Sequence, residues 1–251
     1  MDDTYKKFAH TMRLDTYLVR EKLIASRSRA QRAIKSGFVT VDGRTVVKAS
    51  FDITRHQVVT VGAAADRPAG YWKLRGIQEA HELIKTGDTV LDIGASAGGF
   101  LSCAAELARE VYAVEFSSSC KPVLEAVAGR YPGQVTVIYA DAFSFDFGRL
   151  GVRFDVLLND ITAEPTDALK LFSKVSSVLK TGGLVLQVFK GKVAEQAARD
   201  LMTRIEDEGF RIVTVLSAQK DELYVIAQKK RDDGRRGRDL NPCEARASPA
   251  V

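Results

Sequence analysis

The feature that most constrains the fold is a regular alternation of short apolar runs with amphipathic segments between residues 89 and 228. The runs are unbroken, which is typical of parallel strands buried on both faces of a sheet. Only residues 217–221 separate the last two runs, too few for a crossover, so the final strand must be antiparallel. The sequence therefore predicts an α/β fold with a seven-stranded sheet that ends in a hairpin. Strands are expected at 89–93, 111–115, 135–139, 154–160, 184–189, 211–216 and 222–228, and helices at about 75–85, 100–109, 119–129, 166–179 and 193–208.

A glycine-rich loop and two acids follow the first three predicted strands. The loop spans residues 92–100, DIGASAGGF, and its glycines allow the backbone to approach a ligand closely. Glu115 ends the second strand, where an acid accepts hydrogen bonds from a ribose diol, and Asp141 follows the third, where an acid can receive an adenine amino group. The pattern predicts an adenosine-containing cofactor, and the absence of G-K-[ST] argues against a nucleotide-hydrolysing P-loop. The candidate cofactor-binding residues are Asp92, Gly94, Gly98, Gly99, Phe100, Glu115, Asp141 and Asp160.

The first quarter of the chain is expected to form a separate basic module. Residues 1–62 carry 12 Lys and Arg against 6 Asp and Glu, whereas the rest of the chain is close to neutral. The small and Pro-containing residues 63–70 are typical of a linker to a body at 71–230. Residues 231–251 are polar and rich in Gly and Arg, which predicts a disordered basic tail. A polyanion is the expected partner of such a module.

Two short helices and a hairpin are expected within the basic module. Apolar residues at helical spacing place the first helix near Asp15, an acceptable N-cap, and Ser26 or Ser28 can cap the second. The alternating run FVTVDGRTVV predicts two strands around the Asp42-Gly43 turn. A row of cations on the second helix suits contact with a phosphate backbone, although solvation of a short helix explains such a row equally well. These cations are Arg29, Arg32 and Lys35.

The order of residues in this module is more specific than its charge. R-L-D-x-x-L, followed by S-R-S-x-A-x-x-x-I-x-x-G-x-V-x-V-D-G, closely resembles the S4 RNA-binding domain over about residues 12–60. The resemblance implies a small α+β domain that binds structured RNA. The residues that it implies for RNA contact are Arg13, Arg27, Arg29, Arg32 and Lys35.

Four charged residues are expected at the carboxyl edge of the sheet. Asp160 closes the fourth strand, Lys190 closes the fifth, Glu222 opens the seventh, and Lys73 precedes the helix that returns to the first strand. With the strings DIGASAGGF, GGLVLQVFKG and ELYVIA, these residues resemble the Lys-Asp-Lys-Glu tetrad of the FtsJ-type RNA ribose 2′-O-methyltransferases over about residues 70–230. A ribose hydroxyl is a poor acid, so its methylation needs a positioned base and cations that stabilise the developing alkoxide. The resemblance implies that one lysine receives the hydroxyl proton and that the other stabilises the alkoxide.

The combination of an S4 domain with a Rossmann-like methyltransferase domain resembles the TlyA (haemolysin A-like) family. This resemblance implies S-adenosylmethionine as the cofactor and ribosomal RNA or a ribosomal subunit as the partner. One position departs from the FtsJ pattern, because the usual strand-five lysine aligns with Gln187, and Lys190 lies roughly 10 Å further along an extended strand. The departure leaves open a non-catalytic RNA-binding or ribosome-assembly factor. The final hairpin and the lysine pair disfavour an NAD-dependent oxidoreductase.

Other classes of protein and site receive little support. The three cysteines have no C-x-x-C spacing and the three histidines are scattered, so we expect neither a disulfide framework nor a metal site. No apolar stretch approaches the ~18 residues of a membrane span, and the opening residues lack a secretory signal, so we expect a cytoplasmic protein. Tyr71 and Trp72 could stack on an RNA base or anchor the packing between the two domains.

Overall fold

The computed structural model describes residues 11–62, 65–218 and 222–231. The chain divides into two compact units, of which one comprises Met1–Gly87 and Ala95–Ala140 and the other Asp88–Gly94 and Asp141–Val251. Apart from Arg231, the predicted basic tail lies outside the described residues. Among the described helices, none is long and apolar enough to cross a membrane.

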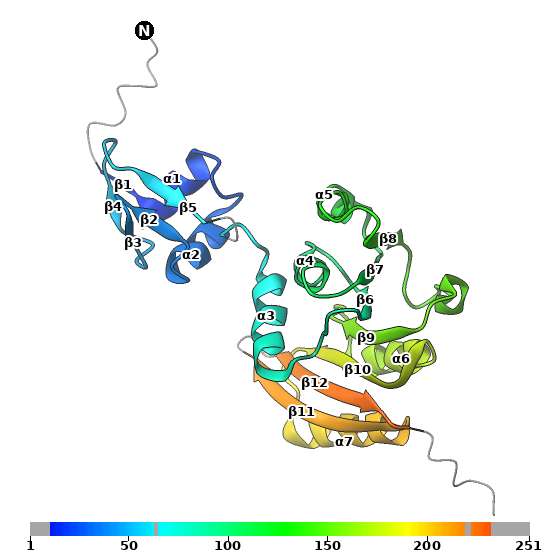
Figure 1. Cartoon of the computed structure of the whole chain (residues 1–251). Helices are drawn as coiled ribbons and strands as arrows, with labels where there is room; N and C mark the ends of the chain where they lie inside the picture. The colour runs from blue at the N-terminus through cyan, green and yellow to red at the C-terminus, as the bar shows by residue number, and fades with distance from the viewer. Residues whose placement is uncertain (1–10, 63–64, 219–221, 232–251) are drawn as a thin grey trace, which may run out of the picture. The chain divides into compact units, whose positions relative to one another are not determined.

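The N-terminal module is a small α+β domain with two short sheets (Figure 1). Strand β1 pairs with β4, and β2 lies between β3 and β5 in an antiparallel sheet. The predicted hairpin is confirmed, and both Asp42 and Gly43 in its turn have positive φ, as a tight two-residue turn requires. The Ser26 side chain caps α2 by accepting a hydrogen bond from the Arg29 amide. The elements are β1 (Met12–Arg13), α1 (Leu14–Arg20), α2 (Arg27–Lys35), β2 (Val39–Val41), β3 (Arg44–Thr45), β4 (Asp52–Ile53) and β5 (Val59–Val61).

The predicted capping role of Asp15 is wrong. Helix α1 begins at Leu14, and its first amides donate to backbone carbonyls elsewhere in the module: Leu14 N to Phe51 O at 2.7 Å and Asp15 N to Ala49 O at 3.2 Å. Because tertiary contacts already satisfy these amides, the helix needs no side-chain cap. Asp15 is instead fully buried, and its carboxylate binds other side chains.

The larger domain is built on one seven-stranded sheet, as predicted (Figure 1). The strand order is β11-β12-β10-β9-β6-β7-β8, in which β12 is antiparallel to both of its neighbours. The recorded pairings of β9 with β10, β6 with β9, and β7 with β8 are parallel. The strands are β6 (Thr89–Ile93), β7 (Glu110–Glu115), β8 (Val135–Tyr139), β9 (Phe154–Asn159), β10 (Leu179–Lys190), β11 (Phe210–Ala218) and β12 (Glu222–Lys229).

All five predicted helices are present, but α3 is shifted towards the N-terminus and α4 ends at Ala105, before its predicted end at 109. Helix α3 follows Pro68 and begins at Ala69, within the stretch predicted as a linker. Its buried residues Tyr71, Leu74 and Ile77 recur at helical spacing, so Lys73 lies inside the helix and not before it. The helices are α3 (Ala69–His81), α4 (Gly99–Ala105), α5 (Lys121–Ala128), α6 (Pro165–Ser176) and α7 (Glu195–Asp207), with 3-10 turns at Ser118–Cys120 and Phe147–Leu150.

Candidate active site

Three of the predicted catalytic residues meet where β9 and β10 end and β12 begins. Asp160 directly follows β9, Lys190 is the last residue of β10, and Glu222 is the first residue of β12 and the register partner of Lys190. The Lys190 Nζ donates to Asp160 Oδ1 and, at 3.2 Å, to Glu222 Oε1. The three side chains retain only 23%, 17% and 12% exposure, respectively. The strand ends therefore bring residues 160, 190 and 222 together into one half-buried ionic cluster.

The cluster holds Lys190 as an ammonium. Burial opposes the charge, but the hydrogen bond and charge of Asp160 and the charge of Glu222 outweigh burial and raise the pKa of Lys190 above its usual value. Tyr224, also buried, donates its hydroxyl to Glu222 Oε2 at 2.6 Å. Burial and this carboxylate raise the pKa of Tyr224, so Tyr224 remains a neutral donor. Sequence reasoning missed Tyr224, although its position two residues after Glu222 on a strand places both on one face.

Gln187 lies away from this cluster, in the interior of the sheet. Its Oε1 accepts a hydrogen bond from Asn159 Nδ2 at 2.7 Å, and its Nε2 donates to Val188 O at 2.9 Å. Gln187 and Asn159 are register partners on β10 and β9, and both are fully buried. The position that aligns with the usual strand-five lysine thus holds a neutral amide pair, whereas Lys190, three residues later, binds the two carboxylates.

Lys73, the fourth predicted catalytic residue, belongs to the compact unit that contains residues 1–87, whereas the three clustered residues belong to the other unit. Lys73 lies half-buried in α3. Its membership of the catalytic group stays a prediction.

The loop after β6 is tightly packed at its first glycine. Gly94 has φ +83°, and a Cβ there would lie 3.1 Å from Ile161 Cγ2 and 3.3 Å from Asp160 O, so a side chain there would be both strained and crowded. Glu115, at the end of β7, accepts the Ser96 amide at 2.8 Å and the Ser117 amide at 2.7 Å. The carboxylate of Glu115 therefore orders the loop at residue 96 as well as the turn that follows its own strand.

The remaining predicted cofactor residues have different surroundings. Asp92 is fully buried, and Asp141 is exposed with its Oδ1 accepting the Phe143 amide at 2.9 Å. Packing accounts for Gly99, because a Cβ there would lie 2.7 Å from Tyr71 N. Gly98 is left-handed at the start of α4, and Phe100 is buried in that helix. Contact of these residues with a cofactor stays a prediction, and an ordered acid at the end of β7 fits the ribose of an adenosine moiety.

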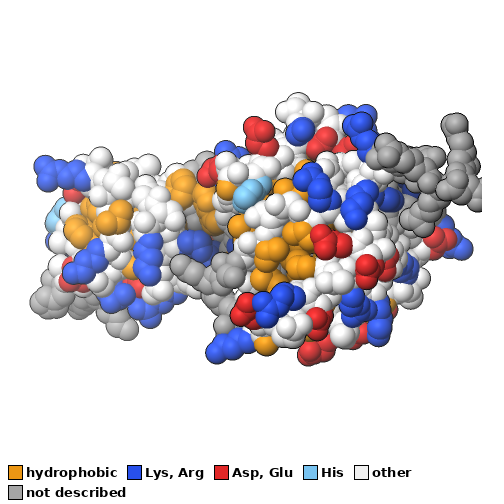
Figure 2. Space-filling model, turned by 90° about the horizontal axis from the view of Figure 1, so that it is seen from below, with side chains coloured by type: hydrophobic (Ala, Val, Ile, Leu, Met, Phe, Trp, Pro, Cys, Tyr) orange, Lys and Arg blue, Asp and Glu red, His pale blue; other side chains and the backbone are white. Residues whose placement is uncertain are grey.

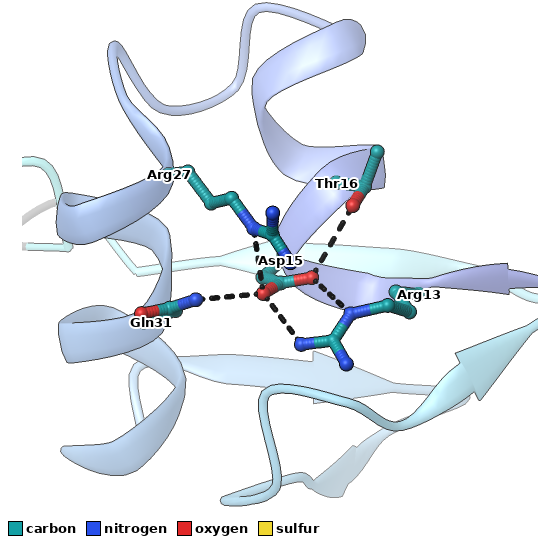
Figure 3. Close-up of polar contacts among 5 residues, drawn as sticks. All are labelled: Arg13, Asp15, Thr16, Arg27 and Gln31. Atoms are coloured by element: carbon teal, nitrogen blue, oxygen red, sulfur yellow. Dashed lines mark hydrogen bonds and ion pairs between the residues drawn. The ribbon is translucent and has the colours of Figure 1, made fainter.

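The five predicted RNA-binding cations do not form a uniform row. Arg13 and Arg27 both bind Asp15 (Figure 3), and Arg29 binds the side chain and the carbonyl of Asp66. Arg32 is half-buried and Lys35 is exposed in the last turn of α2. On the face that Figure 2 shows, basic side chains are interspersed with acidic ones. The role of Asp15 in holding two of the arginines is the feature of this module that sequence reasoning missed.

The aromatic residues beside Lys73 take part in packing. The ring of Trp72 lies 4.9 Å from that of Phe38. The Tyr71 hydroxyl donates to Glu106 Oε2 at 2.7 Å, and Arg67 binds the other oxygen of Glu106 at 2.6 Å. These contacts favour the packing alternative over stacking on an RNA base.

Comparisons with known proteins match both parts of the chain. The S4 domain model matches residues 12–59, and the FtsJ-like methyltransferase model matches residues 67–230. The ribosomal RNA large subunit methyltransferase E of Desulfosudis oleivorans is 29% identical over 180 residues, which cover 64% of this chain and 83% of that protein.

Two solved structures share the fold. A protein named as a hemolysin, from Streptococcus thermophilus, has a TM-score of 0.55 at 17% identity and covers 88% of this chain and 89% of its own. The fibrillarin of Aeropyrum pernix, in complex with S-adenosyl-L-methionine, has a TM-score of 0.51 at 22% identity over 58% of this chain and 68% of its own. Because the methyltransferase model spans more than half of the sequence, the chain belongs to the FtsJ-like methyltransferase family, with an S4 domain preceding the methyltransferase domain.

Proposed function

We propose that the protein transfers a methyl group from S-adenosylmethionine to a ribose 2′-hydroxyl of ribosomal RNA. The observation that carries the proposal is the cluster of Asp160, Lys190 and Glu222 within an FtsJ-like domain. The S4 domain and the relative named as a ribosomal RNA methyltransferase support RNA as the substrate class. Ribosomal RNA or a ribosomal subunit is then the partner, and the cytoplasm is the compartment in which the protein acts.

S-adenosylmethionine, when bound, supplies a methyl group on a sulfonium centre. Of this chain's residues, Glu115 would hold the ribose and Asp141 the adenine amino group, in agreement with their positions at the ends of β7 and β8. The glycines of the loop after β6 would let the loop follow its tight path beside the cofactor, because their Cβ positions are taken up by neighbouring residues of the protein.

Lys190 would act on the ribose as a cation. Its raised pKa keeps it protonated, so in its resting form it donates a hydrogen bond and cannot accept the hydroxyl proton. Fixed by Asp160 and Glu222, the ammonium orients the 2′-oxygen and stabilises negative charge that develops on it. A carboxylate of the cluster can accept the hydroxyl proton as the oxygen attacks the methyl group, so that negative charge develops on the oxygen while the thioether leaves. This assignment gives Lys190 the alkoxide-stabilising role that the resemblance implies for one of the two lysines, and Lys73 remains the predicted second lysine.

Methyl transfer to ribosomal RNA and to isolated ribosomal subunits tests the proposal, with mapping of 2′-O-methylated positions. Lys190→Met should lower turnover by about 10²–10³-fold while S-adenosylmethionine binding changes little. Lys180→Met is a matched control, because Lys180 lies near the other end of β10 and binds Asp155 of β9 at 2.8 Å, also as an ion pair between the two strands. Its activity should equal that of the wild type. A wild-type protein that binds RNA and the cofactor but transfers no methyl group would favour the non-catalytic assembly factor.

A further inference from the structure

Asp15 is a fully buried carboxylate on which three long side chains converge (Figure 3). Its Oδ1 accepts Arg13 Nε at 3.0 Å and Thr16 Oγ1 at 3.3 Å. Its Oδ2 accepts Arg13 Nη2 at 2.9 Å, Gln31 Nε2 at 2.9 Å and Arg27 Nε at 3.1 Å. A carboxylate offers about four lone-pair positions, so these contacts saturate it. Asp15 is therefore fully committed to holding its neighbours.

The two arginines keep the capacity to bind an anion while Asp15 holds them. Arg13 donates two of its five N–H groups to Asp15, and Arg27 donates one. The side chains of Arg13 and Arg27 are 44% and 59% exposed, whereas that of Asp15 is not exposed at all. Two guanidinium groups around one carboxylate leave one net positive charge. The surface at this point therefore exposes the two guanidinium groups and not the carboxylate.

The geometry also brings the two guanidinium groups close to each other. Arg13 Nη2 and Arg27 Nε bind the same oxygen of Asp15, so these nitrogens lie within about 6 Å of one another. The hydrogen bond from Arg13 opposes the effect of burial and, with those from Gln31 and Arg27, holds the pKa of Asp15 well below its usual value. The carboxylate is thus ionised at neutral pH, and it fixes both arginines before any ligand arrives.

We propose that Asp15 is a positioning residue that holds Arg13 and Arg27 as a preformed clamp for an RNA phosphate group. The inference rests on the proposed function, because it names how the N-terminal module grips the RNA. A guanidinium fork matches a phosphate group, and side chains that are already ordered lose less conformational entropy on binding. Arg29 is not part of the clamp, because its guanidinium group is bound to Asp66.

The clamp is tested by whether neutralising the buried carboxylate strengthens or weakens RNA binding. Asp15→Asn makes the module more positive, so electrostatics alone would tighten RNA binding and steepen its dependence on salt. If Asp15 positions the arginines, the full-length variant should instead bind purified ribosomal RNA about tenfold more weakly, with a shallower salt dependence. Glu21→Gln is the matched control, because Glu21 is an exposed acid of the same module whose recorded ion pair is with Arg20. This control should bind as tightly as the wild type or slightly more tightly.

If Asp15→Asn does not fold, a pair of arginine-to-lysine variants tests the clamp. Arg27→Lys keeps the charge but lacks the fork, so it should weaken binding, whereas Arg20→Lys on α1 should not. Equal binding by the two lysine variants, or binding by a folded Asp15→Asn as tight as that of Glu21→Gln, would overturn the clamp. Failure of the wild type to bind ribosomal RNA would overturn both the clamp and the RNA substrate. Tight RNA binding without methyl transfer would overturn the proposed activity and support the clamp if the variants behave as expected.

Discussion

Replacing Gln187 with lysine tests whether a charged side chain can be buried at this position of β10 without loss of stability. Gln187 is fully buried and faces the amide of Asn159 at 2.7 Å, not a carboxylate. Burial there should depress the pKa of a lysine until the protein folds with the amine neutral. Removing the proton from a lysine of ordinary pKa at pH 7 costs up to about 4.6 kcal/mol, at 1.36 kcal/mol per pKa unit. For a chain of this size, that loss lowers the Tm by about 9–18 °C.

The pH dependence of this loss distinguishes a buried amine from a packing defect. The unfolded Gln187→Lys chain binds one proton more than the folded chain, so its stability relative to the wild type should rise with pH by about 1.4 kcal/mol per unit above pH 7. Gln187→Met is the control: it leaves the Asn159 donor without its partner, and it should cost about 1–3 kcal/mol at every pH. Thermal and urea unfolding at pH 7 and above measure the stabilities of the two variants relative to the wild type. Wild-type stability of Gln187→Lys at pH 7 would refute the reasoning, because the lysine would then have found a carboxylate from inside the strand.

Three further predictions concern the cofactor, the RNA and the reaction. Glu115→Gln and Asp141→Asn should each weaken S-adenosylmethionine binding by about 10–100-fold, and unchanged affinity in both by calorimetry would contradict the cofactor assignment. Removal of residues 1–62 should impair salt-sensitive capture of ribosomal RNA and leave cofactor binding nearly unchanged, as RNA-binding and calorimetric titrations would show. Because the pKa of Lys190 is raised, the rate of methyl transfer should not increase tenfold per pH unit from about pH 7 to 9. Such an increase in a pH–rate profile would show that a group of high pKa, and not a carboxylate of the cluster, accepts the proton.

The strands could be predicted because they are buried on both faces. Continuous apolar runs located all seven strands of the large sheet, and the short connection at 217–221 predicted the antiparallel β12. The start of β10 was harder to predict, because Gly182 and Gly183 suggest a turn. The structure begins β10 at Leu179 and shifts its register against β9 between Leu179 and Leu184. Pairing of Leu179 with Phe154 on the neighbouring strand thus extends β10 beyond the apolar run that the sequence shows.

The placement of Asp160, Lys190 and Glu222 at one edge was also predictable, because the ends of neighbouring strands share an edge of the sheet. Local pattern could not decide between Gln187 and Lys190 as the functional position. The register of the sheet shows what each position contacts, since it pairs Lys190 with Glu222 and Gln187 with Asn159, and the catalytic role of Lys190 stays a prediction.

The sequence by itself determined the order of the elements, the two domains' characters and the strand ends at which charged residues gather. These follow from periodicity and spacing, which act over a few residues. Tertiary structure alone decided the partners of individual polar groups. Asp15 could have capped a helix, but carbonyls of residues 49 and 51 satisfy the helix amides and leave its carboxylate to Arg13 and Arg27. Hydrogen-bond partners distant in the chain compete for the same group, and only the folded arrangement determines which of them reaches it.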